Sequence, residues 1–164
     1  MPEMIRDGEI VSNEWQRLDA DSIAENGVPE SGKVIVPLAV WQAQKEALKA
    51  RGDIGVCLDP GEEPEALADD VSALPLVAIN FPAFKDGRGY SYARELRTRF
   101  GFTGELRAVG DVLRDQLFYL WRVGFNAFEV RDDRDIQEAL SGLKDYTVTY
   151  QGDVHDPRPI YRRA

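Results

Sequence analysis

The stretch LVAINF at residues 76–81, followed after a polar loop by LRAV at residues 106–109, decides the fold. Each stretch is short and rich in apolar, β-favouring residues, which is typical of a strand covered on both faces. Between them, Ala93, Leu96 and Phe100 recur at the spacing of one helix face. A strand, a helix and a second strand in this order predict a crossover between two parallel strands.

The same alternation continues on both sides of this unit. Further apolar runs predict strands at residues 34–36, 54–58 and 127–130. Apolar residues at helical spacing predict helices over residues 40–51, 67–74, 113–121 and 136–143. About five β-α units therefore predict an α/β fold with a mainly parallel sheet. Two forms remain open at this point, an open doubly wound sheet and a partial barrel.

The two ends of the chain have a different pattern. Residues 4–18 carry Asp7 and Gly8 between two apolar runs, which predicts a β-hairpin. The alternation over residues 146–150 predicts an edge strand. We divide the chain into an N-terminal hairpin with a connector (1–32), an α/β domain (33–150) and a C-terminal tail (151–164).

Composition narrows the class of protein. The chain has 164 residues, 43% of them hydrophobic, which suits one folded domain. Its formal charge of -9 opposes a nucleic-acid backbone, so we expect no nucleic-acid partner. No segment approaches the length of a membrane span or of a signal peptide, so we expect a cytoplasmic protein without a membrane partner. The single cysteine, Cys57, lies in an apolar run and is expected in the core.

Polar residues follow the predicted strands. Because the carboxyl ends of parallel strands meet at one edge of a sheet, these residues are expected on a shared rim where ligands bind. The rim predicted in this way comprises Pro37, Asp59, Pro60, Asn80, Asp86, Tyr90, Gly110, Asp111, Arg114, Asp115, Glu129 and Arg131.

Within this rim, Gly87, Arg88 and Gly89 directly precede a predicted helix. Free backbone N–H groups and the helix dipole favour an anion there, and an arginine can hold an oxyanion through two hydrogen bonds. These residues are therefore candidates for binding a small sulfur or phosphorus oxyanion. A structural turn, in which Arg88 pairs with Asp86 or Asp111, is the other interpretation.

A second group of candidates lies at the start of the following helix. Arg114 is positioned there to hold the same anion, and Asp111 and Asp115 are candidates for a catalytic acid and base. The alternative is that both carboxylates cap the helix and complement its dipole.

Motifs for common cofactors are missing from the sequence. There is no phosphate-binding G-x-x-x-x-G-K-[ST] loop, and Tyr92 stands where a dinucleotide fingerprint needs its third glycine. One cysteine and one histidine, His155, predict neither a metal centre nor a catalytic triad. The cofactor is therefore unknown from the sequence.

Aromatic residues gather near one helix and the next strand. We expect most of them in the core, whereas an outward Tyr119 or Trp121 would indicate an interface with another subunit, such as that of a homo-oligomer. The group consists of Phe118, Tyr119, Trp121, Phe125 and Phe128.

Two long blocks, residues 74–91 and 103–119, resemble bacterial domain-of-unknown-function family 934, whose members are labelled probable oxidoreductases involved in sulfite reduction. Shorter segments at residues 58–60, 65–68 and 156–159 are similar as well. The resemblance implies a role in assimilatory sulfate reduction, because the family's genes typically neighbour that of sulfite reductase. It brings no established catalytic residues.

Two hypotheses follow from the sequence. The first is an accessory protein that acts with sulfite reductase. The alternative is an enzyme that binds a small anion at the carboxyl ends of the parallel strands.

Overall fold

The computed structural model describes residues 3–82, 87–130 and 135–147, with the backbone alone for Arg114 and residues 144–147. Within these residues the strands form one eight-stranded sheet, in the order β2-β1-β8-β7-β6-β5-β4-β3. The strands are β1 (Glu3–Arg6), β2 (Glu9–Ser12), β3 (Gln16–Arg17), β4 (Val34–Pro37), β5 (Ile54–Leu58), β6 (Leu76–Phe81), β7 (Glu105–Gly110) and β8 (Ala127–Phe128).

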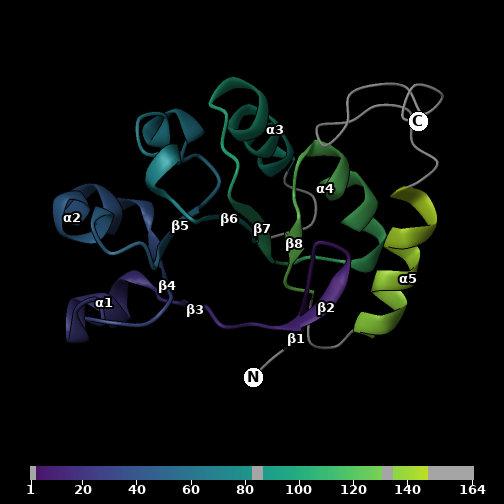
Figure 1. Ribbon diagram of the computed structural model, residues 1–164, viewed down its shortest axis with the longest axis horizontal. Helices are drawn as coiled ribbons and strands as arrows, with labels where there is room; N and C mark the ends of the chain where they lie inside the picture. Colours follow the sequence, from purple (N-terminus) through teal and green to yellow (C-terminus); the bar gives the residue numbers. More distant parts are fainter. Residues whose placement is uncertain (1–2, 83–86, 131–134, 148–164) are drawn as a thin grey trace.

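From β3 to β8 each strand runs parallel to the next strand in the chain. The sheet curls into a half-barrel with the helices on its outer side (Figure 1). This sequential order excludes the doubly wound alternative, in which the strand order reverses near the middle of the sheet. The α/β fold with a mainly parallel sheet and an N-terminal hairpin is confirmed, in its partial-barrel form.

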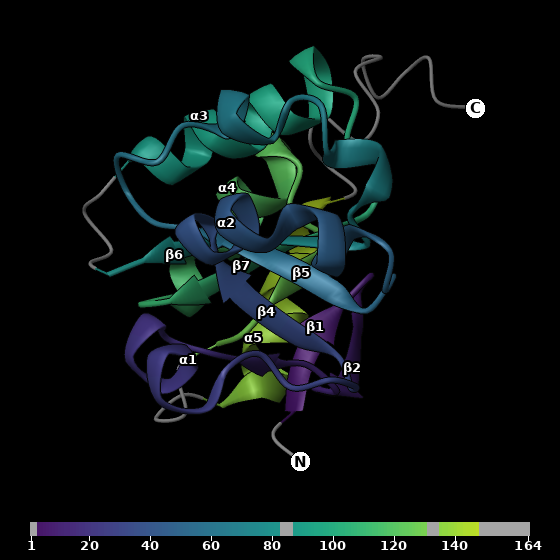
Figure 2. The same ribbon diagram turned by 90° about the vertical axis from the view of Figure 1, so that its left-hand side faces the viewer.

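The helices are α1 (Ala20–Asn26), α2 (Leu38–Lys49), α3 (Arg88–Arg94), α4 (Leu117–Val123) and α5 (Ile136–Thr147). Helix α3 continues as a π-helical turn, η3 (Glu95–Arg99). Helix α2 lies over β4 and β5 (Figure 2), whereas α5 packs on α4 and on the hairpin. Each connection between successive parallel strands therefore crosses the outer side of the curled sheet.

The prediction of a helix over residues 67–74 is wrong. This segment forms two short 3-10 helices, η1 (Pro64–Leu67) and η2 (Val71–Ala73). The buried carboxylate of Asp70 lies between them and accepts hydrogen bonds from Trp41 Nε1 at 3.1 Å and Lys45 Nζ at 2.9 Å. Contact with α2 therefore holds this segment as two short 3-10 helices, and a regular helix does not form.

Two predicted strand boundaries are also wrong. The hairpin ends at Ser12 and not at residue 18, because Gln16 and Arg17 form β3 and pair with β4 at the opposite edge of the sheet. The edge strand predicted over residues 146–150 begins inside α5, which extends to Thr147, and its remaining residues lie outside the described part of the chain. The predicted turn is confirmed, since Asp7 and Gly8 both adopt positive φ, as a tight hairpin requires.

The core lies mainly between the outer face of the sheet and the helices. The buried side chains there include Val56, Ile79 and Leu106 from the strands, with Trp41 and Leu120 from the helices. A smaller cluster lines the concave face, where Trp15 packs against it. Its buried members are Ile35, Cys57, Leu76, Ala78 and Val109.

The two edge strands, β2 and β3, are joined by residues 13–15 alone, so this link crosses the concave side (Figure 1). Arg107 binds this link, because Arg107 Nη1 donates a hydrogen bond to Asn13 Oδ1 at 2.8 Å. The fully buried guanidinium of Arg107 also pairs with Glu105 at 2.8 Å and Glu129 at 2.9 Å. The half-barrel is thus tied across its opening by one short segment.

Candidate functional site

A cavity of about 420 Å³ lies at the carboxyl ends of β3, β4, β5 and β6. Its size falls within the range of small-molecule sites. Because neighbouring parallel strands end at the same edge, residues that are far apart in the sequence meet here. The lining residues are Arg17, Leu18, Asp19, Ala20, Pro37, Cys57, Asp59 and Asn80.

Of the described residues that line the cavity, Arg17 is the only basic one. It ends β3, and its pairing opposite Ile35 places it on the concave side of the sheet. Its Nη1 donates to Asn80 Oδ1 at 3.5 Å, and it forms no ion pair with any residue that the structure describes. Most of its N–H donors are therefore available to a ligand.

Two carboxylates face the same space. Asp59 Oδ1 accepts a hydrogen bond from Asn80 Nδ2 at 2.9 Å. Asp19 is the N-cap of α1, and one of its oxygens accepts from the Ser22 N–H at 2.7 Å. Among the described residues, neither carboxylate has a cationic partner, and the second oxygen of each makes no hydrogen bond. These two oxygens are acceptors for a ligand.

Cys57 contributes a thiol to the cavity wall and is 8% exposed. Burial raises the pKa of this thiol to about 12, and the nearby Arg17 charge offsets the effect only in part. The side chain is therefore a neutral S–H at neutral pH, and thiolates, not thiols, are the reactive species. Cys57 adds neither charge nor an activated nucleophile to the cavity.

The loop after β5 is held close to the cavity by α3. The Gly61 N–H donates to the Tyr92 hydroxyl at 2.9 Å, and the Asp59 N–H donates to Glu62 Oε1 at 2.7 Å. Tyr92 itself is buried in the core. Asp59 is consequently carried by a loop with fixed hydrogen bonds on both sides of Pro60.

Asn80, Asp59 and Pro37, which were expected on the strand-end rim, do line this cavity. The glycine-flanked arginine lies elsewhere. Arg88 is exposed at the first position of α3, on the side of the Gly61 loop, where its Nη1 would lie 3.9 Å from a Cβ built on Gly61. The oxyanion-binding role of Arg88 stays a prediction.

The two glycines beside Arg88 have different surroundings. Gly89 is buried in α3, where an added Cβ would lie 2.4 Å from Phe81 Cε1. Gly87 is exposed and has open space around its Cα. Tyr90 is half-buried with its ring 5.8 Å from that of Phe81, and burial raises the pKa of its hydroxyl. Because Gly89 has no Cβ, α3 can pack closely against Phe81 of the sheet.

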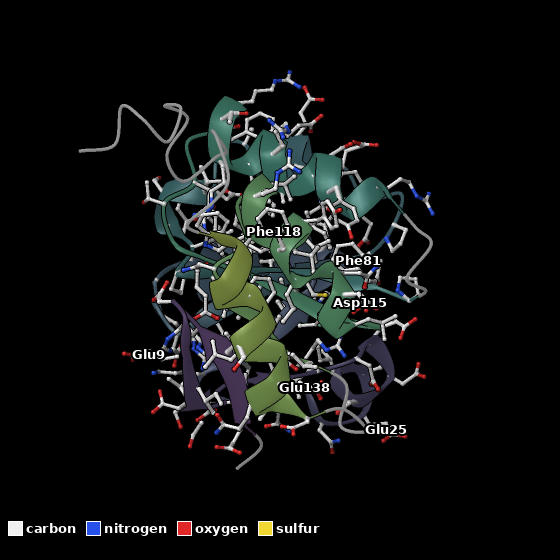
Figure 3. All side chains as sticks on the ribbon, turned by 90° about the vertical axis from the view of Figure 1, so that its right-hand side faces the viewer. Glu9, Glu25, Phe81, Asp115, Phe118 and Glu138 are labelled. Carbon is white, nitrogen blue, oxygen red and sulfur yellow. The ribbon has the colours of Figure 1, made fainter. Side chains whose placement is uncertain are left out.

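The remaining predicted residues whose side chains the structure describes do not line the cavity. Asp111 follows β7, and its backbone N–H donates to Phe81 O at 2.6 Å. Asp115 is exposed in the 3-10 turn η4 (Arg114–Gln116) that leads into α4 (Figure 3). Glu129 is engaged in its ion pair with Arg107. Asp86 lies outside the described residues, and the catalytic roles of Asp111 and Asp115 stay predictions.

Sequence reasoning missed Arg17 and Asp19. Both were assigned to the hairpin and its connector, since a strand of two residues leaves no pattern of its own. The signal that was present is Asp19 before the short helix α1, which is a typical N-cap and marks the end of a preceding element.

Within the described residues, no group of three or more His, Cys, Asp or Glu side chains is placed to hold a metal ion. None of the helices described is long and apolar enough to cross a membrane.

The fold and the cavity together define a class of protein, a half-barrel α/β protein with a polar cavity at the ends of its parallel strands. Within that class, the chain belongs to the family described as bacterial protein of unknown function (DUF934), which matches residues 55–161. No curated protein matches the chain. The matched range includes Cys57, Asp59 and Asn80, whereas Arg17 and Asp19 precede it.

Proposed function

We propose that this protein binds a small sulfur oxyanion in the strand-end cavity, as an accessory protein of assimilatory sulfite reduction. The observation that carries the proposal is Arg17, a guanidinium at the cavity without an ion pair among the described residues. The chemical class follows from the resemblance of residues 74–91 and 103–119 to proteins labelled with sulfite reduction.

The geometry supports binding more than covalent catalysis. A guanidinium presents several N–H donors in one plane, which suits the oxygens of a sulfonyl or sulfite group. Asn80 Oδ1, which accepts from Arg17, helps to orient the guanidinium. Cys57 is a neutral thiol and so is not an activated nucleophile at this position.

Calorimetric titration with sulfite and with sulfate tests this proposal. We expect saturable binding to the wild-type protein and at least tenfold weaker binding to Arg17→Ala. The matched control is Arg94→Ala, which removes an exposed arginine of α3 that does not line the cavity and should leave binding unchanged. Wild-type protein that binds neither ion, or Arg17→Ala protein that binds as tightly as wild type, would contradict the proposal.

A second candidate function is docking to sulfite reductase through α4. Tyr119 is 55% exposed, and its ring centre lies 5.5 Å from that of Phe118. The Arg122 guanidinium lies within 5.9 Å of both ring centres. Aromatic and arginine side chains are enriched at protein interfaces, and Phe118 lies on the face of α4 seen in Figure 3.

Capture of the tagged protein from an expressing bacterium tests the docking hypothesis. Sulfite reductase should co-purify with wild type and with Arg94→Ala, and it should be lost with Tyr119→Ala. Light scattering of the purified protein shows whether the same face instead joins two copies of this chain. A dimer that Tyr119→Ala dissociates, without capture of the reductase, would refute docking.

A further inference from the structure

Among the residues that the structure describes, the fixed charges at the cavity are unbalanced toward the negative. The described lining holds one guanidinium, Arg17, and two carboxylates, Asp19 and Asp59, with Cys57 as a neutral thiol. A bare oxyanion seated at Arg17 would add further negative charge beside both carboxylates. Like charges repel, so an anion that also carries a positive group should bind here more tightly than a bare oxyanion does.

The side-chain amide of Asn80 lies between the guanidinium of Arg17 and the carboxylate of Asp59. Asn80 Oδ1 faces Arg17 at 3.5 Å, and Asn80 Nδ2 faces Asp59 at 2.9 Å. The side chain of Asn80 is thus a spacer that holds a cation on one side and a carboxylate on the other. A ligand that extends from Arg17 past Asn80 to Asp59 therefore meets N–H donors at one end and carboxylate oxygens at the other.

The cavity is also larger than a bare oxyanion. A water molecule takes up about 30 Å³ in the liquid, so an oxyanion with only four or five heavy atoms fills a minor part of about 420 Å³. Leu18, Ala20 and Pro37 provide apolar wall area for the carbon atoms of an organic ligand.

From these three observations we infer that the ligand is a small zwitterion, with its anionic group on Arg17 and an ammonium group on Asp59 and Asp19. The inference rests on the proposed function, which supplies the anionic end. It adds the ammonium group and the carbon skeleton between the two charges. Such a ligand places a negative charge at Arg17 and a positive charge at the carboxylates, and it adds no net charge to the cavity.

Three sulfonates with the same two-carbon skeleton test the inference by calorimetric titration of the full chain at neutral pH. Ethanesulfonate carries the anion alone, 2-hydroxyethanesulfonate adds a hydroxyl, and 2-aminoethanesulfonate adds an ammonium. We expect the amino compound to bind at least tenfold more tightly than each of the other two. All three should weaken in Arg17→Ala.

Asp59→Asn identifies the partner of the ammonium. The substitution keeps an oxygen to accept from Asn80, so the local hydrogen bond is retained while the charge is removed. The advantage of the amino compound should fall in this variant, because only Asp19 remains as a carboxylate partner of the ammonium. Asp69→Asn, which removes an exposed carboxylate outside the cavity lining, should preserve it. Unfolding temperatures confirm that both variants are folded.

The outcomes separate the two proposals. If ethanesulfonate binds as tightly as the amino compound, the zwitterion inference is overturned while anion binding at Arg17 stands. If the amino compound keeps its advantage in Asp59→Asn, the placement of the ammonium is wrong. If no sulfonate binds while sulfite does, the zwitterion inference is overturned and the proposed function stands. If binding is unchanged in Arg17→Ala, the proposed function itself fails.

Discussion

Three arginines on this fold illustrate how surroundings decide what one side chain does. Arg107 is fully buried and neutralised by Glu105 and Glu129. Arg97 donates to the backbone carbonyls of Gly124, Phe102 and Gly104, and burial lowers the pKa of its guanidinium. These two hold the fold together. Among the described residues Arg17 forms no ion pair, and it lines the cavity, so its remaining N–H groups are placed to meet a ligand.

Cys57 provides a prediction for alkaline pH. Its pKa rises from 9.0 to about 12 in the folded protein, so the stability that the buried neutral thiol contributes is complete below pH 9 and is lost as the pH rises toward 12. Over that window the free energy of unfolding should fall by up to about 1.4 kcal/mol per pH unit from this group. Urea unfolding at several pH values measures this slope.

The matched variant is Cys57→Ala, which has no thiol to ionise. Its unfolding free energy should decline less steeply above pH 9 than that of wild type. If the unfolding free energies of the two proteins decline equally with pH, Cys57 ionises as an exposed thiol does.

At this scale the sequence predicted some site residues and not others, for physical reasons. Asp59 and Asn80 follow long apolar strands, so the topology alone brings them to one edge. Arg88 was chosen for its glycine neighbours, but Gly89 serves the packing of α3. Arg17 lies on a strand of two residues, whose place in the sheet depends on a partner strand and not on local pattern.

At the scale of secondary-structure elements, Gly89 lets α3 lie close against β6. A Cβ there would lie 2.4 Å from Phe81 Cε1 and 3.1 Å from Ile79 Cγ2, so Gly89→Ala must push the helix from the sheet. Overpacking of this kind costs about 1–3 kcal/mol. Gly87→Ala, two residues earlier, meets open space and should be close to neutral. Chemical denaturation of the two variants compares them.

Equal stability of Gly89→Ala and wild type would contradict this account of the helix, since it would mean that α3 has room to move. A large loss in Gly87→Ala would instead restore a special role for the exposed glycine.

The segment between β5 and β6 shows where element prediction fails. Leu67, Val71 and Leu74 have helical spacing, yet Asp70 among them is buried by Trp41 and Lys45. A buried carboxylate needs its partners, and those partners lie on α2, almost 30 residues earlier in the chain. Periodicity contains no information about such a contact, so it predicted a continuous helix.

On the scale of the whole molecule, the curled sheet depends on the N-terminal hairpin. Strand β1 pairs with β8, and its Ile5 is buried in the main core. Ile5→Ala should therefore lower the free energy of unfolding of the entire domain by about 2–5 kcal/mol, in one cooperative transition. Ile10→Ala, on the half-buried edge strand β2, should cost less. Urea unfolding followed by circular dichroism and by tryptophan fluorescence measures both.

A separate early transition for the hairpin, with the main transition of Ile5→Ala unchanged, would mean that residues 1–32 behave as an independent appendage. The sequence predicted that division because the hairpin signal is local. The pairing of β1 with β8 joins residues more than 120 positions apart and has no local signature. The parallel strands were predictable because a strand that is buried on both faces has a continuous run of apolar residues.

The central claim is that the strand-end cavity binds a small sulfur oxyanion through Arg17. Two-dimensional ¹H–¹⁵N NMR of the labelled protein during titration with sulfite tests it most directly. The account predicts saturable shifts in the amides of Arg17, Leu18, Asp59 and Asn80, including the side-chain amide of Asn80. Shifts centred instead on Gly87 to Tyr90, or no saturable shift at all, would contradict it.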